Sequence, residues 1–246
     1  MMGCVVLLTS LRGSEPQCEV NVNTTLTEAG KKIAPPTREH PAYYFPVTVG
    51  WREEGSLVAG EQPPPKLMVI HELAKTLAAQ NYLVVGPKTP PPALLLVFHW
   101  GYMNPQIEDF GTGDPAQKVF FNQKEMLALV GGTTLPNLDL SFEREAVMQG
   151  AEDDRYFVVV SAYDFADAVK KKKTRLWVAR MSTPSTGVTM SEVVAALIQS
   201  GGPQFGRETL RPVWVGAPIG REGKVEVGTP TVVPEASAKQ SVPKKK

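Results

Sequence analysis

Cysteine, histidine and unbalanced charge are all scarce in this 246-residue chain, and each shortage excludes a class of protein. The two cysteines, Cys4 and Cys18, form neither a CxxC pair nor a disulfide framework. The three histidines, His40, His71 and His99, lie roughly thirty residues apart, so no HxH or HExxH metal motif exists. We therefore predict no metal, and no sequence motif calls for a cofactor.

A net charge of +1, from 26 basic and 25 acidic residues, gives no overall field that would attract nucleic acid. Residues 170–173 are four consecutive lysines without interleaved aromatic residues, which is typical of a solvated turn. The apolar run at residues 93–98 is far too short to cross a membrane. We expect neither a nucleic-acid partner nor a transmembrane segment.

The apolar pattern of the first half predicts a strand, a helix and a buried strand. Residues 43–51 are aromatic and β-branched, and the run ending at His99 is flanked by proline and glycine. Between them, Leu67, Ile70, Ala74 and Leu77 define one face of a helix that ends at Asn81. A right-handed crossover would place the two strands parallel in one sheet.

The second half predicts two short covering helices, a β-hairpin and a longer helix. Thr189 and Glu192 form a capping box for that last helix. The segments are residues 122–131 and 141–150 for the short helices, 155–164 and 174–183 for the hairpin, and 189–201 for the last helix. Together these patterns predict an α/β (α+β) fold, one domain with a mixed sheet covered by helices.

Composition divides the chain into an arm, a domain and a tail. Residues 1–40 are expected to be an N-terminal arm, residues 41–216 the domain and residues 217–246 a disordered tail. The apolar residues 5–8 and the small residues after them resemble the remnant of an export signal, although a basic leading region is absent. We expect a periplasmic or secreted protein; the alternative is a cytoplasmic one.

Five residues after or within the two buried strands form the candidate ligand site: His99, Trp100 and Tyr102, with Tyr163 and Asp164. If both sets converge at one edge of the sheet, they could bind a small ligand or a peptide. The alternative is that the aromatic residues only close the core. No catalytic residue is predicted, because Ser161 lacks the GxSxG context of a nucleophile elbow.

The segments LAKTLAAQNYLVV and PALLLVFHWG, within residues 43–101, resemble uncharacterised bacterial envelope domains, often lipoproteins. In those domains a helix ending "La..GY" precedes an "aDllV.y" strand; here Pro92 and Ala93 replace the usual acidic residue. The resemblance implies a non-enzymatic exported protein with a structural or binding role, whose partner would be another envelope protein or a small ligand. The alternative is a small hydrolase or other enzyme near His99, favoured if Glu108 or Asp164 lies within hydrogen-bond reach.

Overall fold

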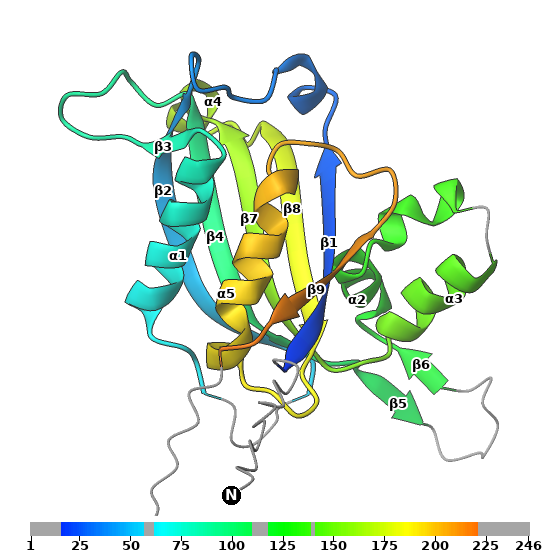
Figure 1. Cartoon of the computed structure of the whole chain (residues 1–246). Helices are drawn as coiled ribbons and strands as arrows, with labels where there is room; N and C mark the ends of the chain where they lie inside the picture. Colours follow the sequence, from blue (N-terminus) through cyan, green and yellow to red (C-terminus); the bar gives the residue numbers. More distant parts are fainter. Residues whose placement is uncertain (1–15, 57–61, 110–117, 139–140, 221–246) are drawn as a thin grey trace, which may run out of the picture.

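A seven-stranded mixed sheet forms the centre of the molecule, in the strand order β3-β2-β4-β7-β8-β1-β9 (Figure 1). The computed structural model describes residues 16–56, 62–109, 118–138 and 141–220. The strands of this sheet are β1 (Gln17–Leu26), β2 (Ala42–Glu54), β3 (Tyr82–Val84), β4 (Leu94–Met103), β7 (Arg155–Asp164), β8 (Arg175–Pro184) and β9 (Val213–Pro218). A separate pair joins β5 (Ile107–Asp109) to β6 (Lys118–Phe120). The predicted α+β fold with a mixed sheet is confirmed.

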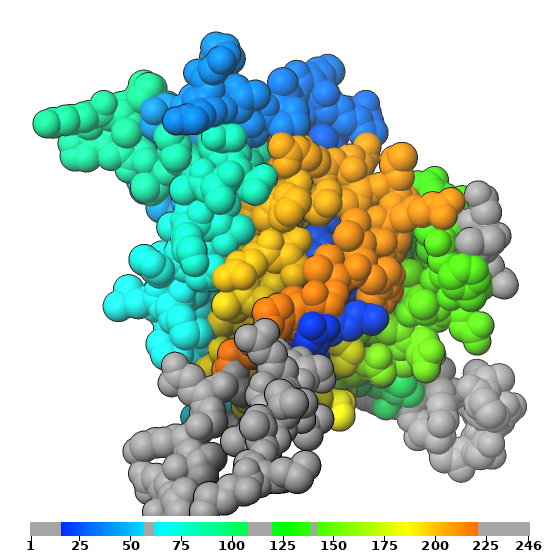
Figure 2. All heavy atoms as spheres, viewed as in Figure 1, coloured from blue at the N-terminus to red at the C-terminus, as the bar shows by residue number. Residues whose placement is uncertain are grey.

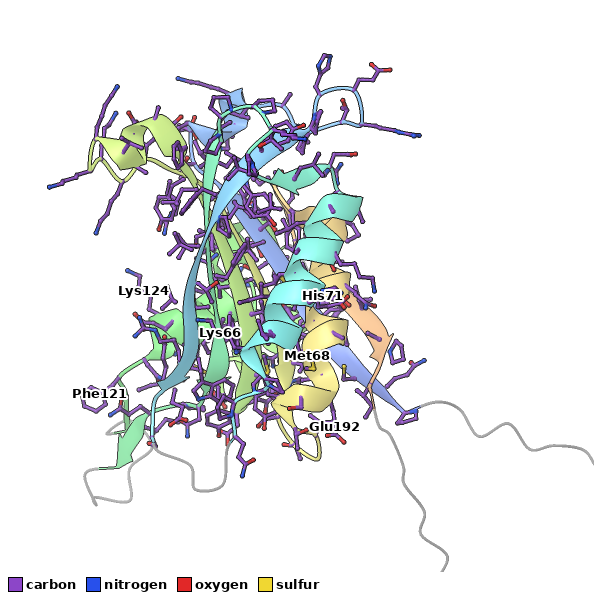
Figure 3. The ribbon with its side chains drawn as sticks, turned by 90° about the vertical axis from the view of Figure 1, so that its left-hand side faces the viewer. Lys66, Met68, His71, Phe121, Lys124 and Glu192 are labelled. Carbon is purple, nitrogen blue, oxygen red and sulfur yellow. The ribbon has the colours of Figure 1, made fainter. Side chains whose placement is uncertain are left out.

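Helices cover the two faces of the sheet unequally. The α-helices are α1 (Lys66–Ala79), α2 (Gln123–Leu129), α3 (Ser141–Gly150), α4 (Phe165–Val169) and α5 (Met190–Gly201); the 3-10 helices are η1 (Gly30–Lys32), η3 (Gly132–Asn137) and η4 (Gly202–Gln204). Figure 2 shows α1 and α5, with the segment leading to β9, spread over one face. On the other face, α2 and α4 leave part of the sheet between them without a helix (Figure 3). Among the described residues, no helix has the length and apolar character needed to span a membrane.

Strand pairing confirms two expectations. β2 and β4 are parallel neighbours, joined through α1 and β3, as the crossover predicts. β7 and β8 form the predicted antiparallel hairpin, and β7 also pairs antiparallel with β4. β4 therefore lies in the middle of the sheet, with its even-numbered side chains in the core beneath α1 and α5.

Two predicted helix ends are confirmed, whereas one predicted helix face is not. Glu192 accepts a hydrogen bond from the Thr189 backbone at 2.7 Å, so the predicted capping box is present. Asn81 adopts the left-handed conformation expected after α1, with φ of 63°. The predicted apolar face of α1 is wrong in part, because Leu67 is 81% exposed. The helix instead buries Val69, Leu73, Thr76 and Leu77, a stripe rotated by about one residue.

The predicted boundaries of arm and tail are wrong, because the sheet begins at Gln17 and ends at Pro218. β1 lies between β8 and β9, within the segment expected to be an arm. The tail expected from residue 217 begins inside β9, and Ile219 still donates a backbone hydrogen bond to Pro16. The proposed export-signal remnant lies outside the described residues, as do residues 221–246 of the tail.

Sequence analysis did not predict β1, because several of its buried residues are polar. Its alternation sends Cys18, Val20 and Val22 into the core beneath α5, while Asn21 and Asn23 are buried on the opposite face. There the two asparagines donate to the carbonyl oxygens of Val130 and Leu129, at the end of α2. Since the last carbonyls of a helix lack partners within the helix, these side chains satisfy acceptors that would otherwise be buried unpaired.

Candidate functional site

The predicted residues of β4 do not stand beyond the end of the strand, because β4 continues to Met103. Trp100 and Tyr102 point into the core beneath α1 and α5, where they are 2% and 3% exposed. The Tyr102 hydroxyl donates to Asp154 Oδ2 at 2.7 Å. These two aromatic residues therefore close the core, which was the alternative to a role in ligand binding.

Tyr163 and Asp164 lie at the opposite end of the sheet from Tyr102. Because β4 and β7 are antiparallel, Tyr163 pairs with Leu95 and Asp164 with Leu94, at the start of β4. Asp164 accepts a hydrogen bond from the Asp167 backbone at 2.8 Å and caps α4. The prediction that all five residues converge at one edge is wrong, because two antiparallel strands end at opposite edges of the sheet.

His99 and Tyr163 do share one surface, the sheet area between α4 and α2 that no helix of the described segments covers. We call this surface the open face (Figure 3). Both residues line a cavity of about 320 Å³, together with Ser161, Arg175 and Arg180. Of the five predicted residues, these two remain candidates for ligand contact.

The floor of the open face is apolar where it approaches α4. Leu95, Val97 and Tyr163 line a second cavity of about 460 Å³, so Tyr163 borders both cavities. The neighbouring β2 side chains Phe45 and Val47 pair with Leu95 and Val97 in the strand register. Phe45 is 46% exposed even though its ring packs against Phe165 of α4 at 6.1 Å. A row of apolar side chains this accessible is typical of a contact surface.

Arg180 is the principal charged group in the floor of this face. It pairs with Val159 in the centre of the sheet and is only partly accessible. Its Nη1 donates to Thr25 Oγ1 at 3.4 Å, and no carboxylate of the described residues lies within ion-pairing distance. Burial, and then the nearby charge of Arg175, lower the pKa of Arg180 to about 10. The guanidinium remains charged at neutral pH, and the described residues supply no carboxylate to pair with it.

His99 lies beside this positive charge. Burial, followed by the charges of Arg52 and Arg180, lowers the pKa of His99 to about 4. Its ring meets Phe157 edge-on, with 5.8 Å between the ring centroids. The imidazole is therefore neutral at pH 7 and offers hydrogen bonds without charge.

The charges differ in sign between the two ends of the open face. Glu54 and Glu125 line the cavity near α2, where burial is the main cause of a raised pKa at Glu54. Near α4, Lys171, Lys172 and Lys173 surround the apolar floor and are exposed, as predicted for a solvated turn. Lys172 also forms an ion pair with Asp167 at 3.0 Å. An anion on this face would be attracted toward Arg180 and the lysines.

Sequence analysis missed Arg175 and Arg180. The available signal for Arg180 was a charged residue in the middle of a strand that is otherwise buried, because burying an unpaired charge is costly. Arg175 is the exposed first residue of the same strand and gave no such signal. Among the described residues, no group of three or more histidine, cysteine or acidic side chains could hold a metal ion.

Comparison with known proteins gives no family. No family model matches the chain, and no curated protein matches it. A PelC dodecamer from Paraburkholderia phytofirmans is 11% identical, with a TM-score of 0.35 over 77% of this chain and 97% of that one. A PDZ domain protein from Parabacteroides distasonis is 12% identical, with a TM-score of 0.41 over 81% of this chain and 39% of that one. Similarities this weak assign neither a family nor a function, and the resemblance to bacterial envelope domains stays a prediction.

Proposed function

We propose that this chain is a non-enzymatic binding protein whose open face holds a partner carrying an anionic group beside apolar surface. The observation that carries the proposal is Arg180, a partly buried guanidinium with no carboxylate among the described residues to pair with it. An anion from a partner would supply the missing counter-ion in a poorly solvated place, where charge-assisted hydrogen bonds are strong. The apolar floor of Leu95 and Val97 would bury the partner's apolar part.

The geometry supports binding over the alternative of a hydrolase near His99. Asp164 is paired with Leu94 and His99 with Val159, so the two lie about 17 Å apart along the strands, at roughly 3.3 Å per residue. The Glu108 side chain lies outside the described residues. A histidine with a pKa of about 4 is also a weak general base at neutral pH, because catalytic bases work best near the operating pH.

The test uses two dyes that differ in charge. 1-Anilinonaphthalene-8-sulfonate carries a sulfonate, whereas N-phenyl-1-naphthylamine has similar rings and no charge. We expect the sulfonate to bind the wild-type protein more tightly than the neutral dye does, and Arg180→Gln to weaken only the sulfonate, by about tenfold. Val97→Asp should weaken both dyes, because it places a carboxylate on the apolar floor.

Arg38→Gln is the matched control, since Arg38 is exposed in the loop before β2 and lines neither cavity of the open face. This variant should bind both dyes as the wild-type protein does. If Arg180→Gln folds normally and leaves the affinity for the sulfonate unchanged, the proposal is wrong. Circular dichroism would establish that each variant folds.

We further propose the exported location that the sequence predicts. It is supported by the apolar and small residues near the N-terminus and by the resemblance to envelope domains. Mass spectrometry of native material should find the N-terminus processed, and cell fractionation should place the protein outside the cytoplasm. An intact Met1 on cytoplasmic protein would contradict this part of the proposal.

A further inference from the structure

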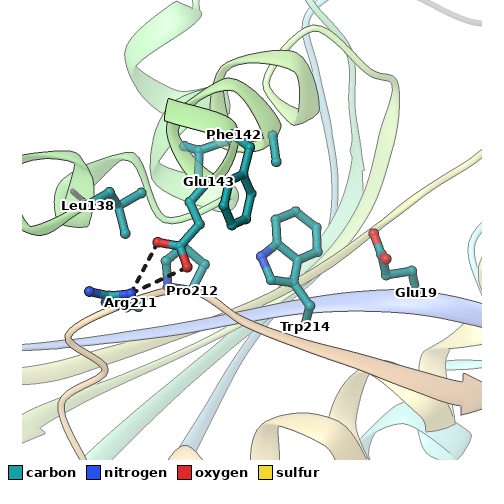
Figure 4. A pocket seen from close by; sticks show the side chains of 9 residues that line it. Glu19, Leu138, Phe142, Glu143, Arg211, Pro212 and Trp214 are labelled. Carbon is teal, nitrogen blue, oxygen red and sulfur yellow. Dashed lines mark hydrogen bonds and ion pairs between the residues drawn. The ribbon is translucent and has the colours of Figure 1, made fainter. Parts of the chain in front are cut away.

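A third cavity, of about 360 Å³, lies between α3 and the edge of the sheet formed by β1 and β9. It is separate from the open face and shares none of the residues proposed above to bind an anion. Figure 4 shows Phe142 of α3 and Trp214 of β9 on opposite sides of it, with Glu143 and Arg211 at one end. We call this cavity the aromatic cleft, lined by Glu19, Leu138, Phe142, Glu143, Ala146, Val147, Arg211, Pro212 and Trp214.

Two large aromatic rings border the cleft and remain accessible to solvent. Phe142 is 64% exposed and Trp214 is 38% exposed. Trp214 and Glu19 also border an adjacent cavity of about 240 Å³, which includes Gln17 and Gly216. Trp214 and Glu19 thus border two cavities at the same edge of the sheet. Exposed aromatic rings beside such cavities can contact a ligand that has an apolar part.

The charges around the cleft favour a cation. Arg211 Nη1 lies 3.3 Å and 3.4 Å from the two carboxylate oxygens of Glu143, so these side chains largely neutralise each other. Glu19 is exposed, and no cation of the described residues forms an ion pair with its carboxylate. The Glu19 carboxylate beside the Trp214 ring therefore has no ion-pair partner among the described residues, although it interacts at longer range with the buried Arg155 guanidinium. Indole is the aromatic group that attracts cations most strongly.

We propose that the aromatic cleft binds the basic side chain of a peptide, a lysine or an arginine. The aliphatic stem would lie between Phe142 and Trp214, and the cationic head would meet the indole face and the Glu19 carboxylate. Both basic side chains combine an apolar stem with a charged end, so they match a cleft that combines rings with a carboxylate. This site is independent of the open face, and its partner has the opposite charge.

The test compares three blocked amino acids: the N-acetyl methylamides of lysine, arginine and norleucine. Titration of ¹⁵N-labelled full-length protein, followed by NMR, should shift the Trp214 indole signal with the two cations. Their affinities should exceed that of norleucine by about two- to fivefold, the ratio expected from a cation–π contact at an accessible ring. Equal affinity for norleucine would show an apolar groove only and overturn the proposal, as would the absence of any shift at Trp214.

Variants locate the site. Trp214→Ala should abolish the preference for cations, and Glu19→Gln should weaken the two cations at least about threefold while leaving norleucine unchanged. Glu39→Gln removes an exposed carboxylate from a loop elsewhere and should have no effect. If Trp214→Ala fails to fold, Glu19→Gln alone decides the question, because its carboxylate is exposed. Unchanged cation binding by Glu19→Gln would overturn the proposal even if Phe142 and Trp214 bind apolar groups.

Discussion

Asn23 Nδ2 donates to the carbonyl oxygen of Leu129 across 2.8 Å, which joins β1, the neighbour of the edge strand β9, to the last turn of α2. Asn21 makes a second such contact, to Val130 at 3.3 Å. Ser182 on the neighbouring strand also donates to Leu129, at 3.3 Å. The helices beside the open face are therefore held to the sheet partly by buried polar contacts, in addition to the apolar cluster around Met126.

Asn23→Ala should destabilise the protein by about 1–3 kcal/mol, because it leaves a buried carbonyl without one of its donors. Urea unfolding measures the change in the free energy of unfolding. Asn137→Ala is the control, since Asn137 is exposed in η3 and its truncation should change stability by less than about 0.5 kcal/mol. An equal loss in both variants would mean that the Asn23 contact contributes nothing specific.

Gly101 cannot accept a side chain, because a Cβ atom there would overlap the backbone of Arg52 on β2. The strand register between β2 and β4 shifts nearby, between Thr48 and Gly50. We predict that Gly101→Ala lowers the free energy of unfolding by more than about 3 kcal/mol, since backbone must move to relieve the overlap.

Gly86→Ala is the comparison for Gly101→Ala, because the nearest atom to its new Cβ would be the Thr89 methyl group at 4.0 Å. This variant should stay within about 0.5 kcal/mol of the wild-type protein in the same urea titration. If Gly101→Ala were as stable as Gly86→Ala, the close approach of β2 and β4 would be incorrect.

Sequence patterns were sufficient to predict β2, α1, β4, α2, α3, the β7–β8 hairpin and α5, but not β5, β6 or α4. They failed at β1, because Asn21, Asn23 and Thr24 are polar residues that become buried through contacts with distant segments. Sequence analysis also failed to predict which candidate site residues lie together, for a related reason. The sequence did not predict that β7 pairs antiparallel with β4, and this direction places Tyr163 beside Leu95 and not beside Tyr102.

The contributions of the three lysines and of Arg180 to anion binding should depend differently on salt concentration. Lys171, Lys172 and Lys173 are exposed, so replacing all three by Gln should weaken binding of the anilinonaphthalene sulfonate at low salt only. In about 0.5 M NaCl the remaining loss should be under about twofold, because salt screens exposed charges. Arg180→Gln should keep most of its effect at that salt concentration. A triple variant whose loss persists in salt would show that the lysines contact the anion directly.

The lysine measurement needs a control for net charge. Lys66 and Lys75 are exposed on α1, which covers the opposite face of the sheet (Figure 3). Replacing both by Gln lowers the net charge of the protein but leaves the open face intact. Binding of the sulfonate should then fall much less than in the triple lysine variant. If the affinity for the sulfonate fell equally in both variants, the effect of the three lysines would be due to the net charge of the protein.

Protonation of His99 should destabilise the fold in weakly acidic solution. Its pKa is lowered from 6.5 to about 4 in the folded protein, first by burial and then by Arg52 and Arg180. Between these two pH values the unfolded chain binds a proton that the folded protein does not, so stability falls as the pH falls from about 6.5 to about 4. The shift corresponds to a loss of about 3 kcal/mol across that window.

His99→Asn should remove this part of the pH dependence. The quantity to compare is the free energy of urea unfolding at pH 7 minus that at pH 4.5, which includes the titration of every carboxyl group in both proteins. The difference should be smaller in His99→Asn than in the wild-type protein by about 2 kcal/mol. His71→Asn, at an exposed position of α1, should retain the wild-type difference. If His99→Asn also retains the wild-type difference, then burial does not hold the imidazole neutral. The effect assigned to the positive charges around His99 would then be too large.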